Sequence, residues 1–179
     1  MKFIKNVLFV LGAVMLINFQ AMAEKNSPLP LYSQVYDEQR NAFDDANAAL
    51  KLADKTNRNV LMVIGGNWCA FCKKMEAFWQ SDTEVAQALY NNYVILKINV
   101  SDKNENKEFM SSMPPIYGYP HIYIANARGK MLLSKDTAEL QVNEQHDTQL
   151  WLAFIDRWKA DKEQAKAVIE IIAKESSNI

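Results

Sequence analysis

Cys69 and Cys72 are the only cysteines of the 179-residue chain, and two residues separate them. They follow the apolar run 60–64, which predicts a buried strand. After them apolar residues recur every three to four positions, which predicts a helix. The N-terminus of a helix has unpaired backbone N–H groups and a partial positive charge, and both stabilise a thiolate. The pair is therefore predicted to be a reactive dithiol at a strand-to-helix turn.

The two thiols are expected to have different roles. Cys69 should lie at the exposed mouth of the turn and act as the nucleophile. Cys72, one helical turn further in, should be partly covered and act as the resolving thiol. Lys73 and the lysine after it add positive charge that favours the thiolate. Because the intervening dipeptide Ala70-Phe71 contains no histidine, we expect a pKa of the first thiol nearer about 7 than the roughly 3.5 of a strong oxidant.

A structural zinc site and a pair of inert buried thiols are the alternative interpretations of the cysteine pair. A structural zinc site needs four Cys or His ligands, and the only further candidates, His121 and His146, are distant in sequence. No metal site is therefore predicted, and two inert buried thiols are the second alternative. Trp68, directly before the first cysteine, is expected to shield the pair and contact partners, with a pure packing role as its alternative.

Residues 1–23 have the pattern of a secretory signal peptide. Lys2 and Lys5 form a positive n-region, residues 7–17 are an apolar core, and residues 21–23 fit the small-x-small cleavage pattern. The core is short for a membrane span, which needs about 20 residues, and an uncleaved anchor is the alternative. The pattern of residues 1–23 therefore predicts an exported chain that lies outside the membrane after signal cleavage. The C-terminus carries no endoplasmic-reticulum retention signal, so we expect the compartment to be a periplasm.

The charge and length of the mature chain indicate what kind of partner it has and how many domains it forms. Without the signal it has 18 basic and 21 acidic residues, a formal net charge of −3, which argues against a nucleic-acid partner. Its 156 residues are enough for one domain with its own core. Two cysteines at such a short spacing indicate chemistry rather than a disulfide framework.

The remaining pattern alternates helices and strands after a proline-containing segment, 24–36, which is expected to be an extended lead-in. The domain is expected to occupy residues 37–179. The predicted elements are, in chain order, helix 37–55, strand 60–64, a helix that carries Cys72 and ends near residue 81, a second helical piece that starts at the capping box 81–84, strand 93–100, strands 121–125 and 131–133, and helix 147–174. Residues 101–108 are predicted to be a polar surface loop that opens a short helix, and residues 136–146 a polar loop. The order indicates an α/β fold with a central mixed sheet of about four to five strands, flanking helices and a long C-terminal helix.

Residues 44–158 resemble the thioredoxin superfamily, and in particular its exported bacterial thioredoxin-like domains. These carry the run Trp-Cys-x-x-Cys-Lys-Lys-Met-Glu, present here at 68–76. The segment Gly118-Tyr119-Pro120 is similar to the family's Gly-x-Pro. The resemblance implies that Pro120 is a cis-proline packed beside the thiols and that Tyr119 offers its backbone to an extended partner segment. Trp68, Tyr119 and Pro120 are therefore the expected substrate-binding residues.

Two positions depart from the family pattern. Val63 stands where the family often has a buried Asp that accepts a proton from the second thiol, so Cys72 must transfer its proton to water or another group. His121 follows the proline where Thr is common. We interpret His121 as a hydrogen-bonded strand histidine, although it could also relay protons to the dithiol. Lys73 and His121 are the candidate modulators of the pair.

These residues predict an exported thiol–disulfide oxidoreductase in which Cys69 exchanges disulfides with protein substrates and Cys72 closes the exchange. No dissociable cofactor is needed, because the electrons reside in the cysteine pair. The expected partners are protein disulfides and a redox partner dithiol protein, and a reductant or isomerase-like role is favoured over a strong oxidant. One alternative is a copper(I)-handling protein that uses Cys69, Cys72 and His121. The other is a non-catalytic peptide-binding module around Trp68 and Tyr119.

Overall fold

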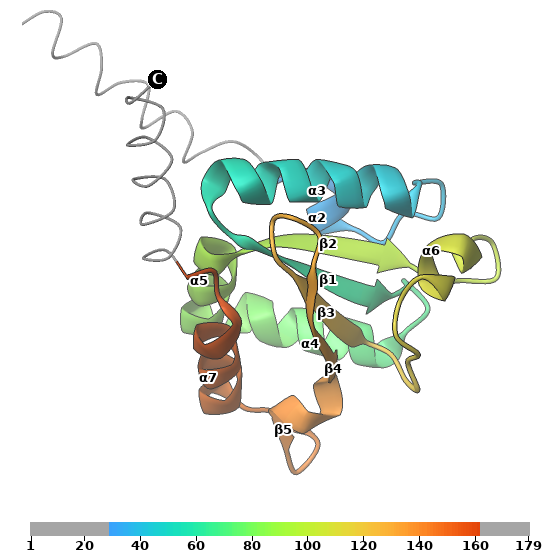
Figure 1. The fold of residues 1–179 in the computed structure, drawn as a ribbon. Coiled ribbons are helices and arrows are strands. Elements are labelled where there is room, and N and C mark those ends of the chain that lie inside the picture. Colours follow the sequence, from blue (N-terminus) through green and yellow to red (C-terminus); the bar gives the residue numbers. More distant parts are fainter. Residues whose placement is uncertain (1–28, 162–179) are drawn as a thin grey trace, which may run out of the picture. The chain divides into compact units, whose positions relative to one another are not determined.

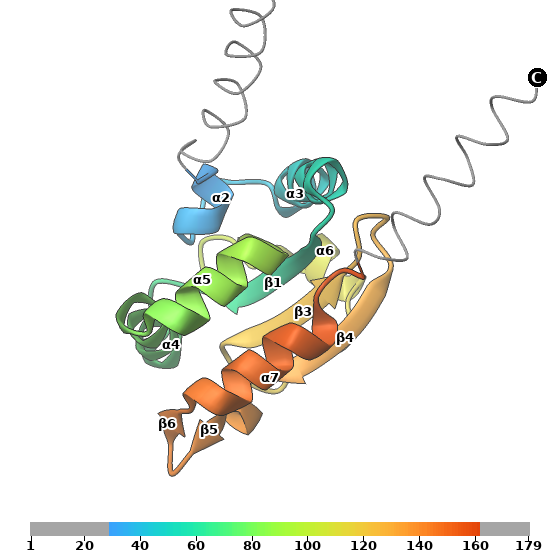
Figure 2. The same cartoon turned by 90° about the vertical axis from the view of Figure 1, so that its left-hand side faces the viewer.

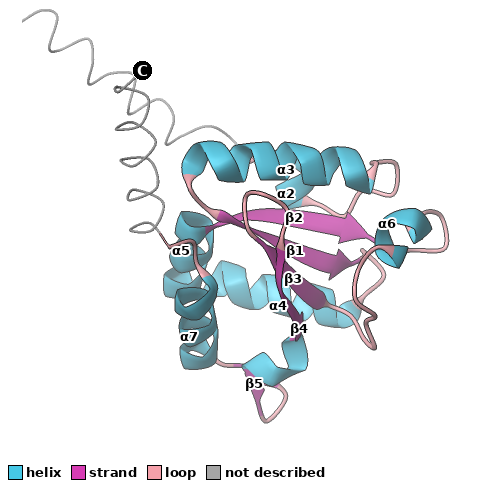
Figure 3. Cartoon of the chain, viewed as in Figure 1, coloured by secondary structure: helices cyan, strands magenta, loops and turns pink. Residues whose placement is uncertain are grey.

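The computed structural model describes residues 29–161, so the predicted signal peptide, 1–23, lies outside the described residues. The folded unit begins at Leu31. Figures 1 and 3 show its central sheet with helices on both faces. The described elements are, in chain order, α2 (Leu31–Gln34), α3 (Ala42–Thr56), β1 (Asn59–Gly65), α4 (Ala70–Ser81), α5 (Thr83–Asn92), β2 (Tyr93–Asn99), α6 (Lys107–Ser111), β3 (His121–Ala125), β4 (Met131–Asp136), the 3-10 helix η2 (Thr137–Leu140), β5 (Gln141–Val142), β6 (Gln145–His146) and α7 (Thr148–Trp158).

The main sheet has four strands in the order β2-β1-β3-β4. Strands β1 and β2 are parallel, whereas β3 is antiparallel to both β1 and β4. The predicted α/β class with a mixed sheet is therefore confirmed. Ile64 pairs with His121, and Gly65 pairs with Asn99. This register places the carboxyl end of β1, from which the cysteine turn starts, beside the first residue of β3.

The central strand β1 is buried along its whole length, because it is covered on both faces. Leu61 and Val63 pack into the core on the side of α4, α5 and α7. Met62 and Ile64, which point the other way, pack with residues of α2 and α3. Figure 2 shows these two helical layers on opposite sides of the sheet.

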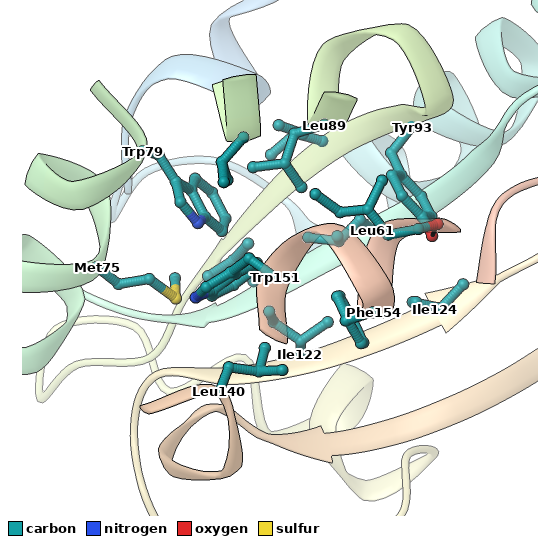
Figure 4. Packing of buried hydrophobic residues seen from close by; sticks show 14 of the residues in the cluster. Leu61, Met75, Trp79, Leu89, Tyr93, Ile122, Ile124, Leu140, Trp151 and Phe154 are labelled. Carbon is teal, nitrogen blue, oxygen red and sulfur yellow. Dashed lines mark hydrogen bonds between the residues drawn. The ribbon is translucent and has the colours of Figure 1, made fainter. Parts of the chain in front are cut away.

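The core between the sheet and α7 is built around Trp151, which has no exposed surface. Its ring makes edge-to-face contacts with Trp79 of α4 and with Phe154, at centroid distances of 5.2 and 5.7 Å. The indole N–H donates to Nδ1 of His146 over 3.2 Å, so its polar atom has a partner. Figure 4 shows Trp151 within this cluster, which joins α4 and α7 to the sheet and to Leu140 of η2.

The segment predicted to be an extended lead-in contains a helix instead. Residues 31–34 form the single turn α2, whose Tyr32 and Ser33 are buried. The Ser33 hydroxyl donates to the carbonyl of Ile95 in the edge strand β2. Burial against β2 therefore determines the conformation of this segment, and the local sequence carries no signal for it.

Other boundaries also differ from the prediction, and β4 extends to Asp136 instead of ending at residue 133. The helix expected from residue 37 begins only at Ala42, since the Asn41 side chain caps it by accepting the N–H of Phe43 at 2.9 Å. The last helix ends at Trp158, whose carbonyl accepts the side-chain N–H of Asn59 at 2.9 Å; residues 162–174 of the predicted helix lie outside the described part of the chain. The expected polar loop 136–146 contains η2 and the β5–β6 hairpin.

Candidate active site

Cys69 and Cys72 lie after the end of β1, at the start of α4, as the sequence pattern predicts. Cys69 is the N-cap of α4, and its Sγ accepts the backbone N–H of Cys72 at 3.1 Å. The two residues form a disulfide with a Cα–Cα distance of 5.2 Å. A sulfur that already accepts a backbone N–H at the positive end of a helix is well placed to carry negative charge once the disulfide opens.

Cys69 does not lie at an exposed mouth of the turn, which corrects the expectation from the sequence. In the disulfide form Cys69 is 3% exposed and Cys72 is 1% exposed. Both cysteines belong to the buried cluster that includes Tyr36 and Met75. Two large apolar side chains beside the disulfide, Trp68 and Phe71, are exposed, at 57% and 64%.

Four hydrogen bonds fix the turn between β1 and α4. The carbonyl of Gly65 accepts the N–H of Val100 at 2.7 Å, and the indole N–H of Trp68 donates to the Val100 carbonyl at 2.7 Å. The carbonyl of Gly66 accepts the N–H of Cys69 at 3.1 Å. The Asn67 side chain donates to the carbonyl of Tyr36 at 2.8 Å. The turn is therefore tied to the end of β2 and to the segment before α3.

Gly65 leaves no room for a side chain next to the disulfide. A Cβ at this position would lie 2.5 Å from Sγ of Cys72 and 3.1 Å from the Tyr36 hydroxyl oxygen. We predict that Gly65→Ala lowers the free energy of unfolding of the disulfide form by about 1–3 kcal/mol, as overpacking of a core does. Denaturant titration measures this loss.

Gly118→Ala is the matched control for this change. Nothing lies within 4 Å of a Cβ at Gly118, so its stability should stay within about 0.5 kcal/mol of the parent. Equal losses in the two variants would mean that contact with Cys72 and Tyr36 is not the cause.

Two of the predicted substrate-binding residues, Trp68 and Tyr119, are in contact with each other. The rings of Trp68 and Tyr119 meet edge to face with their centroids 5.4 Å apart. The Tyr119–Pro120 peptide bond is cis, and Pro120 is buried directly before β3. Trp68 and Tyr119 also line a groove of about 910 Å³ whose apolar wall includes Met110 and Ile116. A partner segment in this groove would lie next to the cysteine turn.

The two candidate modulators differ in their surroundings. His121 is buried, and its Nε2 lies 2.8 Å from the hydroxyl of Ser134, which agrees with a hydrogen-bonded strand histidine. Burial lowers the pKa of His121, and the charge of Asp136 opposes this effect more weakly. The Lys73 side chain is on the exposed side of α4. Among the described residues no three His, Cys, Asp or Glu side chains converge to hold a metal ion.

The fold and the helix-capping disulfide agree with the comparison to known families, in which a model described as thioredoxin-like matches residues 41–127. Residues 41–127 form a thioredoxin-like domain. The solved structure of a disulphide isomerase from Xylella fastidiosa Temecula1 has the same fold, with a TM-score of 0.59 and 24% identity. That likeness covers 68% of this chain and 94% of the other.

The curated relatives match a shorter part of this chain than the disulphide isomerase structure does. The thiol:disulfide interchange protein DsbD of Pseudoalteromonas atlantica is 29% identical over 88 residues, which is 49% of this chain. DsbD of Salmonella typhimurium is 31% identical over 90 residues, which is 50% of this chain. The match spans only 15% of the length of each of these relatives.

Three residues of the thioredoxin-like site could not be assigned a role from the sequence: Tyr36, Glu76 and Lys97. Lys97 of β2 forms a 2.8 Å ion pair with Glu76 of α4, and its ammonium group lies 5.5 Å from the centre of the Tyr36 ring. The position of Lys97 within the apolar strand 93–100 is a sequence signal, because a buried charge in a strand needs a charged partner. For Tyr36 no periodicity or motif gives such a signal.

Proposed function

We propose that this thioredoxin-like chain is a thiol–disulfide oxidoreductase that exchanges the Cys69–Cys72 pair with disulfides of protein substrates. The observation that carries the proposal is the disulfide at the N-terminus of α4, where Sγ of Cys69 accepts a backbone N–H. A disulfide at a helix N-terminus has one sulfur that is stabilised as a thiolate, which is the requirement for rapid exchange. The names of the DsbD and disulphide isomerase relatives support the same chemistry.

In the reducing direction, exchange proceeds in two displacements. The Cys69 thiolate attacks one sulfur of a substrate disulfide, forms a mixed disulfide with it, and releases the other substrate sulfur as a thiolate. Cys72 then gives up its proton and attacks Sγ of Cys69. The Cys69–Cys72 bond forms, the second substrate sulfur leaves, and two electrons have passed to the substrate.

We also propose a reductant or isomerase-like role, which requires a dithiol partner protein to reduce Cys69–Cys72 again. The dipeptide Ala70-Phe71 supports this direction, because no histidine is present between the cysteines to stabilise the thiolate further. Export to a periplasm remains part of the proposal and is based on the pattern of residues 1–23. None of the helices in the range 29–161 has the length and apolar character of a membrane span.

The direct test is catalysed reduction of insulin disulfides, with dithiothreitol as the source of electrons. The wild-type chain should accelerate insulin precipitation well above the rate with dithiothreitol alone. A chain that binds insulin without accelerating its reduction would instead be a peptide-binding module. Retention of one copper(I) per chain after washing with a chelator, without insulin reduction, would favour the copper-handling alternative.

The aromatic surface beside the disulfide should contribute to this activity. We predict that Trp68→Ala lowers kcat/KM for insulin about tenfold, ~1.4 kcal/mol, because Trp68 is exposed and lines the groove that leads to the cysteines. Its exchange with the small disulfide of oxidised glutathione, which does not fill the groove, should change less than threefold.

Tyr90→Ala is the control for loss of an exposed aromatic ring. Tyr90 is on α5, and its carbonyl accepts a hydrogen bond from Arg58, which precedes β1 at the end of the sheet opposite the cysteine turn. Insulin reduction by this variant should match that of the wild type. If both variants lose activity equally, the groove beside Trp68 is not the docking site.

A further inference from the structure

Tyr36 places a buried phenol close to the resolving cysteine. We propose that its hydroxyl group is the hydrogen-bond donor that stabilises the Cys72 thiolate when the disulfide opens. This role concerns the proton and charge balance of the same cysteine pair, so it rests on the proposed function. Val63 stands where the family often has a buried Asp, and its apolar side chain cannot interact with a charged sulfur. Tyr36 would supply a polar group beside Cys72 that Val63 does not provide.

Sγ of Cys72 and the Tyr36 hydroxyl both lie next to Gly65. A Cβ at Gly65 would lie 2.5 Å from Sγ of Cys72 and 3.1 Å from the hydroxyl oxygen of Tyr36. The sum of these distances, 5.6 Å, is the upper limit of the separation between the two atoms. Both therefore face the same small space in front of the Gly65 backbone, and cleavage of the disulfide frees the Cys72 side chain to rotate toward the hydroxyl.

The Tyr36 hydroxyl has no hydrogen-bond partner in the disulfide form, although Tyr36 is only 4% exposed. A buried hydroxyl without a partner costs about 1–3 kcal/mol. Such a group is expected to have a partner in another state of the protein, and the only chemical change at this place is the opening of the disulfide. A thiolate on Cys72 is a charged acceptor, and hydrogen bonds to charged groups are the stronger ones.

The surroundings keep the phenol protonated and fixed in place. Burial raises the pKa of Tyr36, and the negative charge of Glu76 raises it further, so the hydroxyl acts as a donor and not as a base. The Tyr36 carbonyl accepts the Asn67 side chain at 2.8 Å. Two residues earlier, the carbonyl of Gln34 accepts the ammonium group of Lys97 at 2.8 Å. These bonds hold Tyr36 beside the cysteine turn, and neither of them involves a sulfur atom.

The step in which Tyr36 acts can be written with its atoms balanced. A thiolate of the dithiol partner attacks Sγ of Cys69, forms a bond with it and breaks the Cys69–Cys72 bond. The electron pair of the broken bond stays on Sγ of Cys72, which becomes a thiolate. Tyr36 donates its hydrogen bond to this thiolate and keeps its proton, so the proton that later neutralises Cys72 comes from water.

The test is the redox equilibrium of Tyr36→Phe with a glutathione buffer, measured by alkylation of free thiols and mass spectrometry. The substitution keeps the ring and removes the unpartnered hydroxyl from the disulfide form, together with the hydrogen bond of the reduced form. We expect the equilibrium to move about tenfold toward the disulfide, which is about 30 mV more negative for a two-electron couple. The thermal stability of the reduced form should fall relative to that of the disulfide form.

Tyr32→Phe is the matched control, because Tyr32 is a buried tyrosine of the same segment that packs in the other core, with α3. Its equilibrium with glutathione should stay within twofold of the wild type. A Tyr36→Phe equilibrium within twofold of the wild type, or shifted toward the dithiol, would overturn the proposal. This equilibrium requires no protein substrate, so a wild-type chain inactive on insulin would refute the proposed function without deciding the role of Tyr36.

Discussion

Cys69→Ser is expected to abolish insulin reduction, with kcat/KM at least a thousandfold below that of the wild type, ~4 kcal/mol. The reason is that Cys69 caps α4 and accepts a backbone N–H, which makes it the sulfur best stabilised as a thiolate. Cys72→Ser should also lose turnover, but for a different reason. Its Cys69 can still attack a substrate disulfide, and no second thiol is present to release the product.

Mass spectrometry of the two variants after incubation with insulin separates these roles. Cys72→Ser should accumulate a mixed disulfide with an insulin chain, and Cys69→Ser should not. The opposite result, trapping by Cys69→Ser alone, would mean that Cys72 is the nucleophile. Far-UV circular dichroism against the reduced wild type is the control for folding, because both variants lack the disulfide.

Trp151→Ala is expected to produce the largest loss of stability, about 3–5 kcal/mol in the free energy of unfolding, as measured by denaturant titration. Trp151 has no exposed surface, and its ring contacts Trp79 and Phe154 edge to face. The substitution opens a cavity between α4, α7 and the sheet. It also removes the donor that pairs with Nδ1 of His146.

Leu150→Ala is the control in the same helix. Leu150 is 37% exposed, so its removal should cost about 1 kcal/mol or less. A Trp151→Ala loss no larger than that of Leu150→Ala would show that the cluster in Figure 4 does not anchor α7 to the sheet.

Much of the fold and the central part of the site could be predicted from local patterns. The apolar run 60–64 followed by a 3.6-residue periodicity is sufficient to place a buried strand, a turn and a helix. These elements place Cys69 at the helix start without any long-range information. The cis form of the Tyr119–Pro120 bond is implied only by resemblance of 118–120 to a family motif, since about one X–Pro bond in twenty is cis.

The features that could not be predicted depend on contacts between residues far apart in sequence. The segment 31–36 forms a turn because Ser33 bonds to Ile95 of the edge strand. The last described helix ends where Asn59, 99 residues earlier, takes the carbonyl of Trp158. The same is true of Tyr36, whose hydroxyl comes to Cys72 only after the segment has packed beside β2. Periodicity does not contain such contacts.

The burial of Cys69 has another origin. A position at the N-cap of a helix predicts accessibility for a free thiol, whereas the structure holds Cys69 in a disulfide. Sγ of Cys69 is bonded to Cys72 and lies within the cluster that also holds Met75. No sequence pattern specifies the redox state of the pair, so the expectation for a free thiol does not describe the buried disulfide.

The reduction potential of the Cys69–Cys72 pair is the measurement that tests the redox function most directly. In glutathione or dithiothreitol buffers, both thiols should become accessible to alkylation in one reversible two-electron transition. Its midpoint should lie nearer −270 mV, the value of a reductant, than −120 mV, the value of a strong oxidant. A pair that remains a disulfide well below −300 mV would be a structural crosslink, and that result would contradict a function in thiol exchange.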